Sequence, residues 1–104
     1  MWSTIEQPSD LETLLNQTKS FIIFKHSERC SVSRMAKRMF EQEWNLDVDV
    51  FLINVIESRP ASNWVAQHFG INHQSPQVLV VREGQCMYHA SHDDIKAATA
   101  MLYI

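Results

Sequence analysis

Apolar runs and amphipathic segments alternate along most of the chain. The unbroken apolar runs at residues 21–24 and 78–81 are rich in aromatic and β-branched side chains, which predicts strands buried on both faces of a sheet. A turn at residues 82–85 separates the second run from another apolar stretch, so these two should form an antiparallel hairpin. The other expected strands are residues 2–6, 48–53 and 86–90.

Residues with helical periodicity fill the intervals between these strands. Ser9 and Glu12 have the spacing of a capping box, so the first helix should open at Ser9 and end near Lys19. The polar residues 26–29 predict a turn, and a second helix should follow at Cys30. The last two helices are expected from residues 58–60 to Gly70 and from Ser91 onward.

The apolar faces of these helices predict part of the core. The inward residues should be Val32, Met35, Ala36, Met39 and Phe40 in the second helix, Trp64 and Phe69 in the third, and Ile95, Ala98 and Leu102 in the last. The order β-α-β-α-β-α-β-β-α then predicts an α/β fold. Its mixed central sheet should be covered by helices on both faces.

Size and composition indicate one folded domain. The chain has 104 residues, 45% of them hydrophobic, so we expect residues 1–104 to form a single domain with its own core. Two glycines are too few for a glycine-rich phosphate loop, which argues against nucleotide binding. The sequence has neither a secretory leader pattern nor an apolar stretch of membrane-spanning length, so we expect a cytoplasmic protein.

The charge of the chain is distributed unevenly. Its net value of −3 argues against nucleic acid as the main partner, because phosphate binding requires a basic surface. Residues 25–38 nevertheless hold five basic residues against the single acid Glu28, a local charge of +4. Cys30 lies inside this basic segment. A thiol among positive charges indicates a functional location.

Cys30 is the candidate nucleophile. At the start of a helix it meets unpaired backbone N–H groups and the positive end of the helix dipole, and both favour thiolate over thiol. Arg29 and Lys25 act in the same direction. Ser33 stands three residues on, where a dithiol oxidoreductase has its second cysteine. Because a hydroxyl cannot form a disulfide, Cys30 should form mixed disulfides with other molecules.

Three points stay open at this stage. Cys30 could instead be a small buried apolar residue, although its polar and basic neighbours argue against that. Cys86 opens a strand beside apolar residues, which favours a structural or incidental role over that of a resolving thiol. The peptide bond of Ser75-Pro76 precedes a strand, a position where cis bonds occur, but most X-Pro bonds are trans.

Three separated blocks of sequence carry a family resemblance. They are residues 24–33 (FKHSERCSVS), 73–78 (HQSPQV) and 84–92 (GQCMYHASH). With these blocks and its order of elements, the chain resembles the thioredoxin fold over nearly its whole length. More narrowly, it resembles the YtxJ family of monothiol bacilliredoxins. Any one block alone would be weak evidence, so the resemblance rests on the presence of all three blocks in this order.

The resemblance implies a thiol–disulfide oxidoreductase that removes bacillithiol from mixed disulfides on client proteins. It implies that Cys30 is the attacking thiol and that Ser75-Pro76 is a cis-proline turn shaping the substrate groove. No tightly bound cofactor is implied, and bacillithiol is the thiol co-substrate. A proline often follows the cysteine in this family. Here Ser31 stands in that position, and its backbone N–H can hydrogen-bond a thiolate.

Local charge indicates how bacillithiol would be held. The malate portion of bacillithiol carries carboxylates, so Lys25, Arg29 and Arg34 are candidates for charge-assisted hydrogen bonds. Ser31 and Ser33 beside the thiol complete the predicted substrate contacts. The expected partners are S-bacillithiolated client proteins and bacillithiol, with no nucleic acid and no membrane, and we expect a monomer.

Two other classes of function compete with this hypothesis. In the first, the chain is an interaction module or thiol redox sensor, in which Cys30 is modified but turns over no substrate. In the second, a metal binds through His26 and Cys30, or through His89 and His92. The second is weaker, because the sequence has no compact set of four ligands with the spacing of a structural zinc site.

Overall fold

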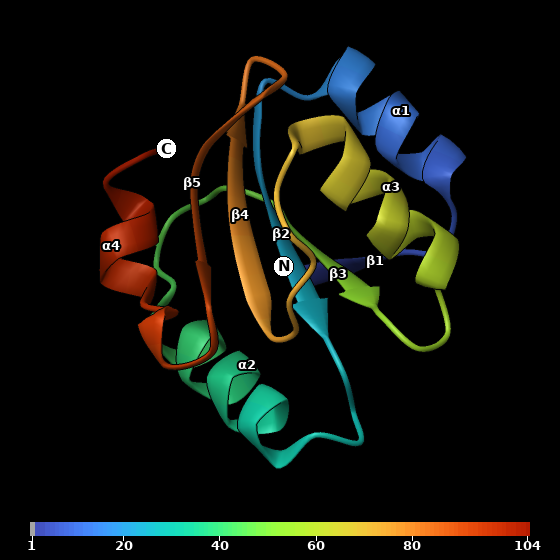
Figure 1. Cartoon of the computed structure of the whole chain (residues 1–104). Helices are drawn as coiled ribbons and strands as arrows, with labels where there is room; N and C mark the ends of the chain where they lie inside the picture. Colours follow the sequence, from blue (N-terminus) through green and yellow to red (C-terminus); the bar gives the residue numbers. More distant parts are fainter. Residues whose placement is uncertain (1) are drawn as a thin grey trace.

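A computed structural model describes residues 2–104 as one five-stranded sheet with helices on both faces (Figure 1). The strands are β1 (Trp2–Ile5), β2 (Ser20–His26), β3 (Val50–Asn54), β4 (Gln77–Arg82) and β5 (Gln85–Ser91). The helices are α1 (Pro8–Gln17), α2 (Ser31–Glu43), α3 (Arg59–Phe69), the 3₁₀ turn η1 (His92–Asp94) and α4 (Ala97–Met101). This order confirms the predicted α/β succession.

The sheet is mixed and its strand order is β1-β3-β2-β4-β5. β3 pairs in parallel with β1 and β2, whereas β4 pairs antiparallel with both β2 and β5. In register, Lys25 of β2 lies opposite Gln77, and Gln77 lies opposite Ser91. The end of β2, the start of β4 and the end of β5 therefore meet at one end of the sheet.

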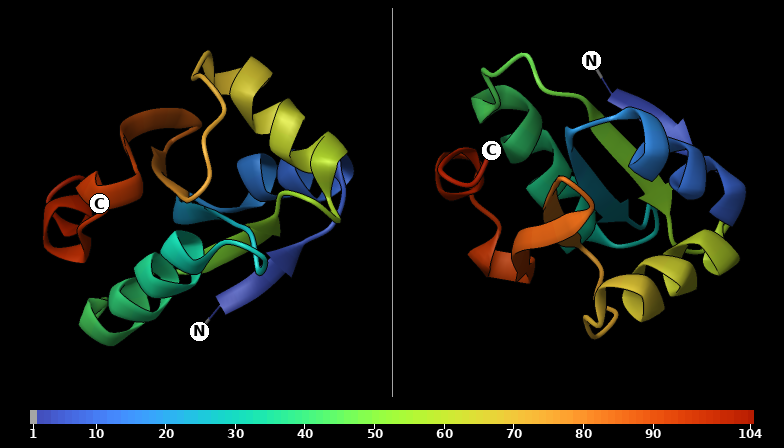
Figure 2. Two further views of the ribbon diagram at one scale, coloured as in Figure 1. Left: turned by 60° about the horizontal axis from the view of Figure 1, so that its bottom comes forward. Right: turned by 90° about the horizontal axis from the view of Figure 1, so that it is seen from above.

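Alternate residues of the strands form two cores, one on each face of the sheet. β2 contributes Phe21 and Ile23 to the core beneath α1 and α3, and Ile22 and Phe24 to the core beneath α2 and α4. Figure 2 shows the same two layers of helices from two further directions. All four of these side chains are fully buried, as predicted for a central strand.

The first helix begins earlier than predicted and has a different cap. It starts at Pro8, and the carboxylate of Asp10 accepts hydrogen bonds from the N–H groups of Glu6 and Gln7, at 3.1 and 3.2 Å. The capping box expected from Ser9 and Glu12 is therefore wrong. Proline is favoured in the first helical position because it lacks the N–H that would be unpaired there.

The last helix is shorter than predicted and turns a different face inward. Ser91 is followed by η1, and α4 starts only at Ala97. The buried residues are Ala97 and Ala100, whereas Ala98 is exposed and Leu102 is 80% exposed. The extended backbone at residues 95 and 96 separates η1 from α4, so a single helical periodicity from Ser91 does not describe this segment.

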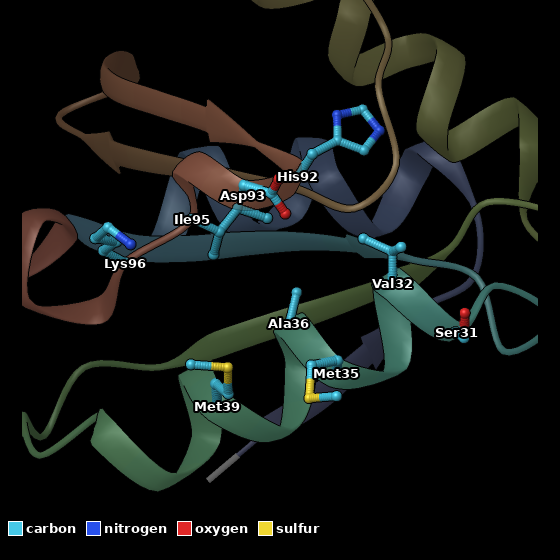
Figure 3. A pocket seen from close by; sticks show the side chains of 9 residues that line it. All are labelled: Ser31, Val32, Met35, Ala36, Met39, His92, Asp93, Ile95 and Lys96. Carbon is cyan, nitrogen blue, oxygen red and sulfur yellow. The ribbon is translucent and has the colours of Figure 1, made fainter.

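Helix α2 also departs from its predicted core face. Phe40 is buried and Ala36 is half-buried, but Val32, Met35 and Met39 are 46, 58 and 51% exposed. The prediction that both methionines belong to the core is wrong. Their stripe faces residues 92–96 across an open groove instead of facing the sheet (Figure 3).

Candidate functional site

Cys30 lies where the central strand passes into α2. It is the N-cap residue of that helix and is half-buried, and its thiol is free. The N–H of Cys30 donates to the carbonyl of Ser27 at 3.2 Å, and its carbonyl accepts from the N–H of Arg34 at 3.0 Å. The predicted placement of Cys30 at a helix start is confirmed. Cys30 therefore stands at the positive end of the helix dipole, and its side chain makes no capping hydrogen bond.

Ser33, three residues after Cys30, is buried and fixed by two hydrogen bonds. The backbone N–H of Ser27 donates to its hydroxyl oxygen at 3.0 Å. The same oxygen lies 2.7 Å from Nδ1 of His26. These bonds connect the end of β2, the loop that carries Cys30 and the first turn of α2. Ser31, by contrast, is exposed at the first helical position.

His26 extends this chain of hydrogen bonds to Glu28 at the surface. The turn predicted over 26–29 begins one residue later, because β2 extends to His26 and buries its ring. Its Nε2 lies 2.8 Å from Glu28, which as a carboxylate can only accept, so Nε2 donates this hydrogen bond. The hydrogen bond from His26 holds the pKa of Glu28 below its usual value, and the charges of His26, Lys37 and Arg34 act in the same direction.

Lys25 occupies a different environment from the one predicted. Its side chain is fully buried, and Nζ donates to the carbonyl of Ser62 at 2.9 Å and to Nδ1 of His73 at 3.2 Å. Burial lowers the pKa of Lys25 to about 8. This arrangement does not fit the predicted role of Lys25 as a contact for a carboxylate at the surface. The amine instead connects β2 with α3 and with the loop that precedes β4.

His73 connects this buried amine to the Ser75-Pro76 turn. The hydroxyl of Ser62 also lies 3.1 Å from Nδ1 of His73. Burial, followed by the charges of Lys25 and Arg59, lowers the pKa of His73. The Ser75–Pro76 peptide bond is cis, and the carbonyl of Pro76 accepts from the N–H of His92 at 3.0 Å.

The two predicted arginine contacts lie at the surface. Arg29 is exposed directly before Cys30. Arg34 is exposed on α2, and its guanidinium donates to the carbonyl of Glu28 at 2.6 Å. Both cations are thus on the loop and helix that surround the thiol. No group of three or more His, Cys, Asp or Glu side chains within residues 2–104 is arranged to hold a metal ion.

Comparison with protein families agrees with this geometry. The sequence profile described as "Monothiol bacilliredoxin BrxC" matches residues 3–100, which is nearly the whole chain. The chain belongs to the monothiol bacilliredoxin family. The matched region contains Cys30, Ser33 and Pro76.

Solved structures show that this bacilliredoxin has the thioredoxin fold. A candidate oxidoreductase with a thioredoxin fold has a TM-score of 0.87 and 23% identity, over 98% of this chain and 92% of that one. The reduced thioredoxin pre-protein of Schistosoma mansoni has a TM-score of 0.76 and 17% identity, over 99% of this chain and 98% of that one. Thioredoxin of Fasciola hepatica has a TM-score of 0.76 and 15% identity, over 98% and 99%. Family and fold together support a thiol oxidoreductase.

The second cysteine of the bacilliredoxin lies far from the first. Cys86 pairs with Val81, which pairs with Phe21 near the start of β2, whereas Cys30 follows the end of β2. The thiols therefore lie at opposite ends of the sheet, and a disulfide requires Cα atoms within about 7 Å. Burial raises the pKa of Cys86, whose thiol donates to the carbonyl of Tyr88 at 3.4 Å. This geometry fits the structural or incidental role.

Three polar residues of this region are not found from the sequence pattern. Glu28 is an ordinary acid in a loop, and Ser62 and His73 are 37 and 48 residues from Lys25. The only local signal is that Lys25 and His26 directly continue an apolar strand. No helix within residues 2–104 is long and apolar enough to cross a membrane.

Proposed function

We propose that this bacilliredoxin removes bacillithiol from mixed disulfides on client proteins and that Cys30 is its nucleophile. The observation that carries the proposal is the pairing of a thiol at a helix N-cap with a buried hydroxyl at the position of a resolving cysteine. Ser33 cannot displace a molecule bound to Cys30, so release requires a second thiol from solution. This is the property expected of a monothiol enzyme.

The reaction is a pair of thiol–disulfide exchanges. The Cys30 thiolate attacks the bacillithiol sulfur of the client disulfide, a new sulfur–sulfur bond forms, and the client leaves as a thiolate that takes a proton from water. A second bacillithiol thiolate then attacks the sulfur that Cys30 holds. This step yields bacillithiol disulfide and restores the Cys30 thiolate. The net reaction exchanges the client's mixed disulfide for bacillithiol disulfide, so that one bacillithiol thiolate is consumed and one client thiolate is produced.

The residues around Cys30 supply the electrostatics of this reaction. The N–H groups of the first turn of α2, including that of Ser31, stabilise the thiolate. Arg29 and Arg34, which are both exposed, bind the malate carboxylates of bacillithiol by charge-assisted hydrogen bonds in this proposal. In this proposal the Ser75-Pro76 turn shapes the substrate groove. The chemistry requires no tightly bound cofactor, only bacillithiol as co-substrate, and a reducing compartment such as the cytoplasm.

Mass spectrometry tests the proposal directly. Wild type, Cys30→Ser and Cys86→Ser are mixed with bacillithiol disulfide, and then separately with a client protein that carries one bacillithiolated cysteine. We expect a bacillithiol adduct on wild type and on Cys86→Ser, none on Cys30→Ser, and client release in the same two cases.

Three outcomes would contradict the proposal. An internal disulfide that needs both cysteines would replace the monothiol mechanism by a dithiol one. Client release by Cys30→Ser at the wild-type rate would exclude Cys30 as the nucleophile. An adduct on Cys30 without client release would favour a redox sensor that turns over no substrate.

A further inference from the structure

A groove of about 390 Å³ runs along α2 beside the proposed nucleophile (Figure 3). One wall is the stripe of Val32, Met35 and Met39, whose side chains are each about half exposed. The segment after β5 forms the other wall, with Ile95 facing the stripe and Asp93 and Lys96 at the rim. Contiguous exposed apolar side chains with a polar rim are characteristic of interaction sites.

The groove is longer than a small thiol requires. A second hollow of about 170 Å³ shares Met39, Ile95 and Lys96 with the first and continues to Glu43. Together the two follow α2 from its first residue to its last, a length of about 20 Å at the rise of an α-helix. An extended polypeptide of about six residues has this length. The dimensions therefore favour a peptide segment over a single low-molecular-weight thiol.

The chemistry of the groove also fits a polypeptide. Its floor is apolar and offers no ring of cations for the carboxylates of bacillithiol, since Asp93 and Glu43 accompany Lys96 at the rim. Met35 and Met39 have flexible, polarizable side chains that adapt to differently shaped partners. A protein that repairs many clients needs such an adaptable surface.

The groove starts at the residue that follows Cys30 in the chain. Ser31 and Val32, which line its first part, directly follow Cys30 in the chain. On the opposite wall, His92 is connected to the turn before β4 by the hydrogen bond from its N–H to the carbonyl of Pro76. A client cysteine in exchange with Cys30 would therefore lie at one end of the groove, with its neighbouring residues directed along α2.

We propose that this groove docks an extended segment of the client polypeptide, with apolar side chains next to the modified cysteine seated on Met35 and Met39. The inference rests on the proposed function, because it treats the partner of Cys30 as a client protein. It goes further by assigning client recognition to the methionine stripe of α2 and bacillithiol recognition to the arginines on the other side of the thiol.

Binding is tested without any thiol chemistry. The probe is a six-residue peptide, Ser-Gly-Leu-Gly-Phe-Gly, in which serine replaces the client cysteine, and its comparison peptide has serine in place of Leu and Phe. The protein carries ¹³C-labelled methionine methyl groups. We expect the apolar peptide to shift the Met35 and Met39 signals and to leave Met87, which is 40% exposed on β5 outside the groove, unchanged. Equal shifts with both peptides, or none with either, would overturn the proposal.

Kinetic measurements then distinguish client docking in the groove from the thiol–disulfide exchange at Cys30. In the double variant Met35→Gln/Met39→Gln we expect KM to rise about tenfold for a bacillithiolated cysteine peptide of the same apolar sequence, because two apolar contacts are lost. KM for bacillithiol disulfide should not change, and Met87→Gln is the matched control for an exposed methionine. A rise for both substrates would contradict client docking.

The two proposals can fail independently of each other. Methionine shifts in a protein that releases no bacillithiol would overturn the proposed function and leave the groove as a peptide site. Bacillithiol release without any shift of the methionine signals would overturn only the docking proposal. If sedimentation shows a dimer that Met35→Gln/Met39→Gln dissociates, and the peptide causes no shift, the groove is an interface between two copies of this chain and the docking proposal is wrong.

Discussion

The Nδ1 atom of His26 lies 2.7 Å from the hydroxyl oxygen of Ser33, and both side chains are buried. His26 is the last residue of β2 and Ser33 belongs to the first turn of α2, so the pair holds both ends of the loop that carries Cys30. The position that a dithiol oxidoreductase uses for redox chemistry is therefore used here to fix the thiol loop.

Removal of the Ser33 hydroxyl should destabilise the fold. In Ser33→Ala, Nδ1 of His26 and the N–H of Ser27 both lose their partner. Leaving such groups unsatisfied in the interior costs about 1–3 kcal/mol. We expect a loss of this size in the free energy of unfolding, measured by urea denaturation. The exposed Ser9→Ala serves as control and should change stability by less than about 0.5 kcal/mol. Equal losses of stability in Ser33→Ala and Ser9→Ala would contradict a stabilising role of this hydrogen-bond network.

A cysteine at the same position should convert the monothiol site into a dithiol site. In Ser33→Cys the new thiol stands three residues after Cys30, on the same side of the first helical turn. Oxidation should then form an internal disulfide with Cys30, seen as a mass decrease of two hydrogens, and the bacillithiol adduct should be lost. Ser31→Cys is the matched control, because adjacent cysteines do not bridge without strain. A persistent adduct on Ser33→Cys would contradict this expectation.

The pair His26 and Glu28 predicts an acid-dependent contribution to stability. The pKa of Glu28 is lowered in the folded chain from its usual 4.5, so folding favours the ionised carboxylate. The contribution is present above this usual value and is lost as pH falls through the lower folded value. The stability difference between wild type and Glu28→Gln should therefore shrink on acidification, as measured by denaturation midpoints. Glu57→Gln, at an exposed carboxyl, is the control, and a constant difference for Glu28→Gln would contradict the coupling.

The sequence predicts those structural features that are determined by residues close together in the chain. Cys30 is identified at a helix start because the strand before it and the periodicity after it are both local patterns. The buried strands are found for the same reason. The contacts of Lys25 are not found, since Ser62 and His73 come close only through the packing of α3 and its following loop on the sheet. From the sequence alone, a buried lysine in a basic segment cannot be distinguished from an exposed one.

The methionines of α2 show a second limit of prediction from the sequence. Helical periodicity identifies an apolar stripe that includes Met35 and Met39, but it does not tell whether another element of the same chain covers it. The covering element is missing because η1 and the extended residues 95 and 96 delay the start of α4. The apolar stripe therefore becomes the floor of a groove.

The buried Lys25 predicts a rise in stability at alkaline pH. Burial lowers its pKa from 10.5 to about 8 in the folded chain, so the unfolded chain binds more protons between these values. Stability of wild type relative to Lys25→Met should then rise with pH across this window, by up to about 1.4 kcal/mol per pH unit. The measurement is urea denaturation of both proteins from pH 7 to pH 10.5. Lys19→Met, at an exposed lysine, is the control, and parallel curves for Lys25→Met would contradict the burial of a titrating amine.

The two cysteines should differ in their reaction with iodoacetamide. Burial raises the pKa of Cys86 and so reduces its thiolate fraction at neutral pH. Cys30 lies instead at the N-cap of α2, outside the apolar core, directly after the exposed Arg29. We therefore expect native protein at pH 7 to be alkylated faster on Cys30 than on Cys86. Peptide mapping of partly modified wild type measures the ratio, and the Cys30→Ser and Cys86→Ser variants give each rate alone. In urea the two rates should converge, because the burial of Cys86 depends on the fold. Equal rates in the native protein would contradict the assignment of distinct environments to the two thiols.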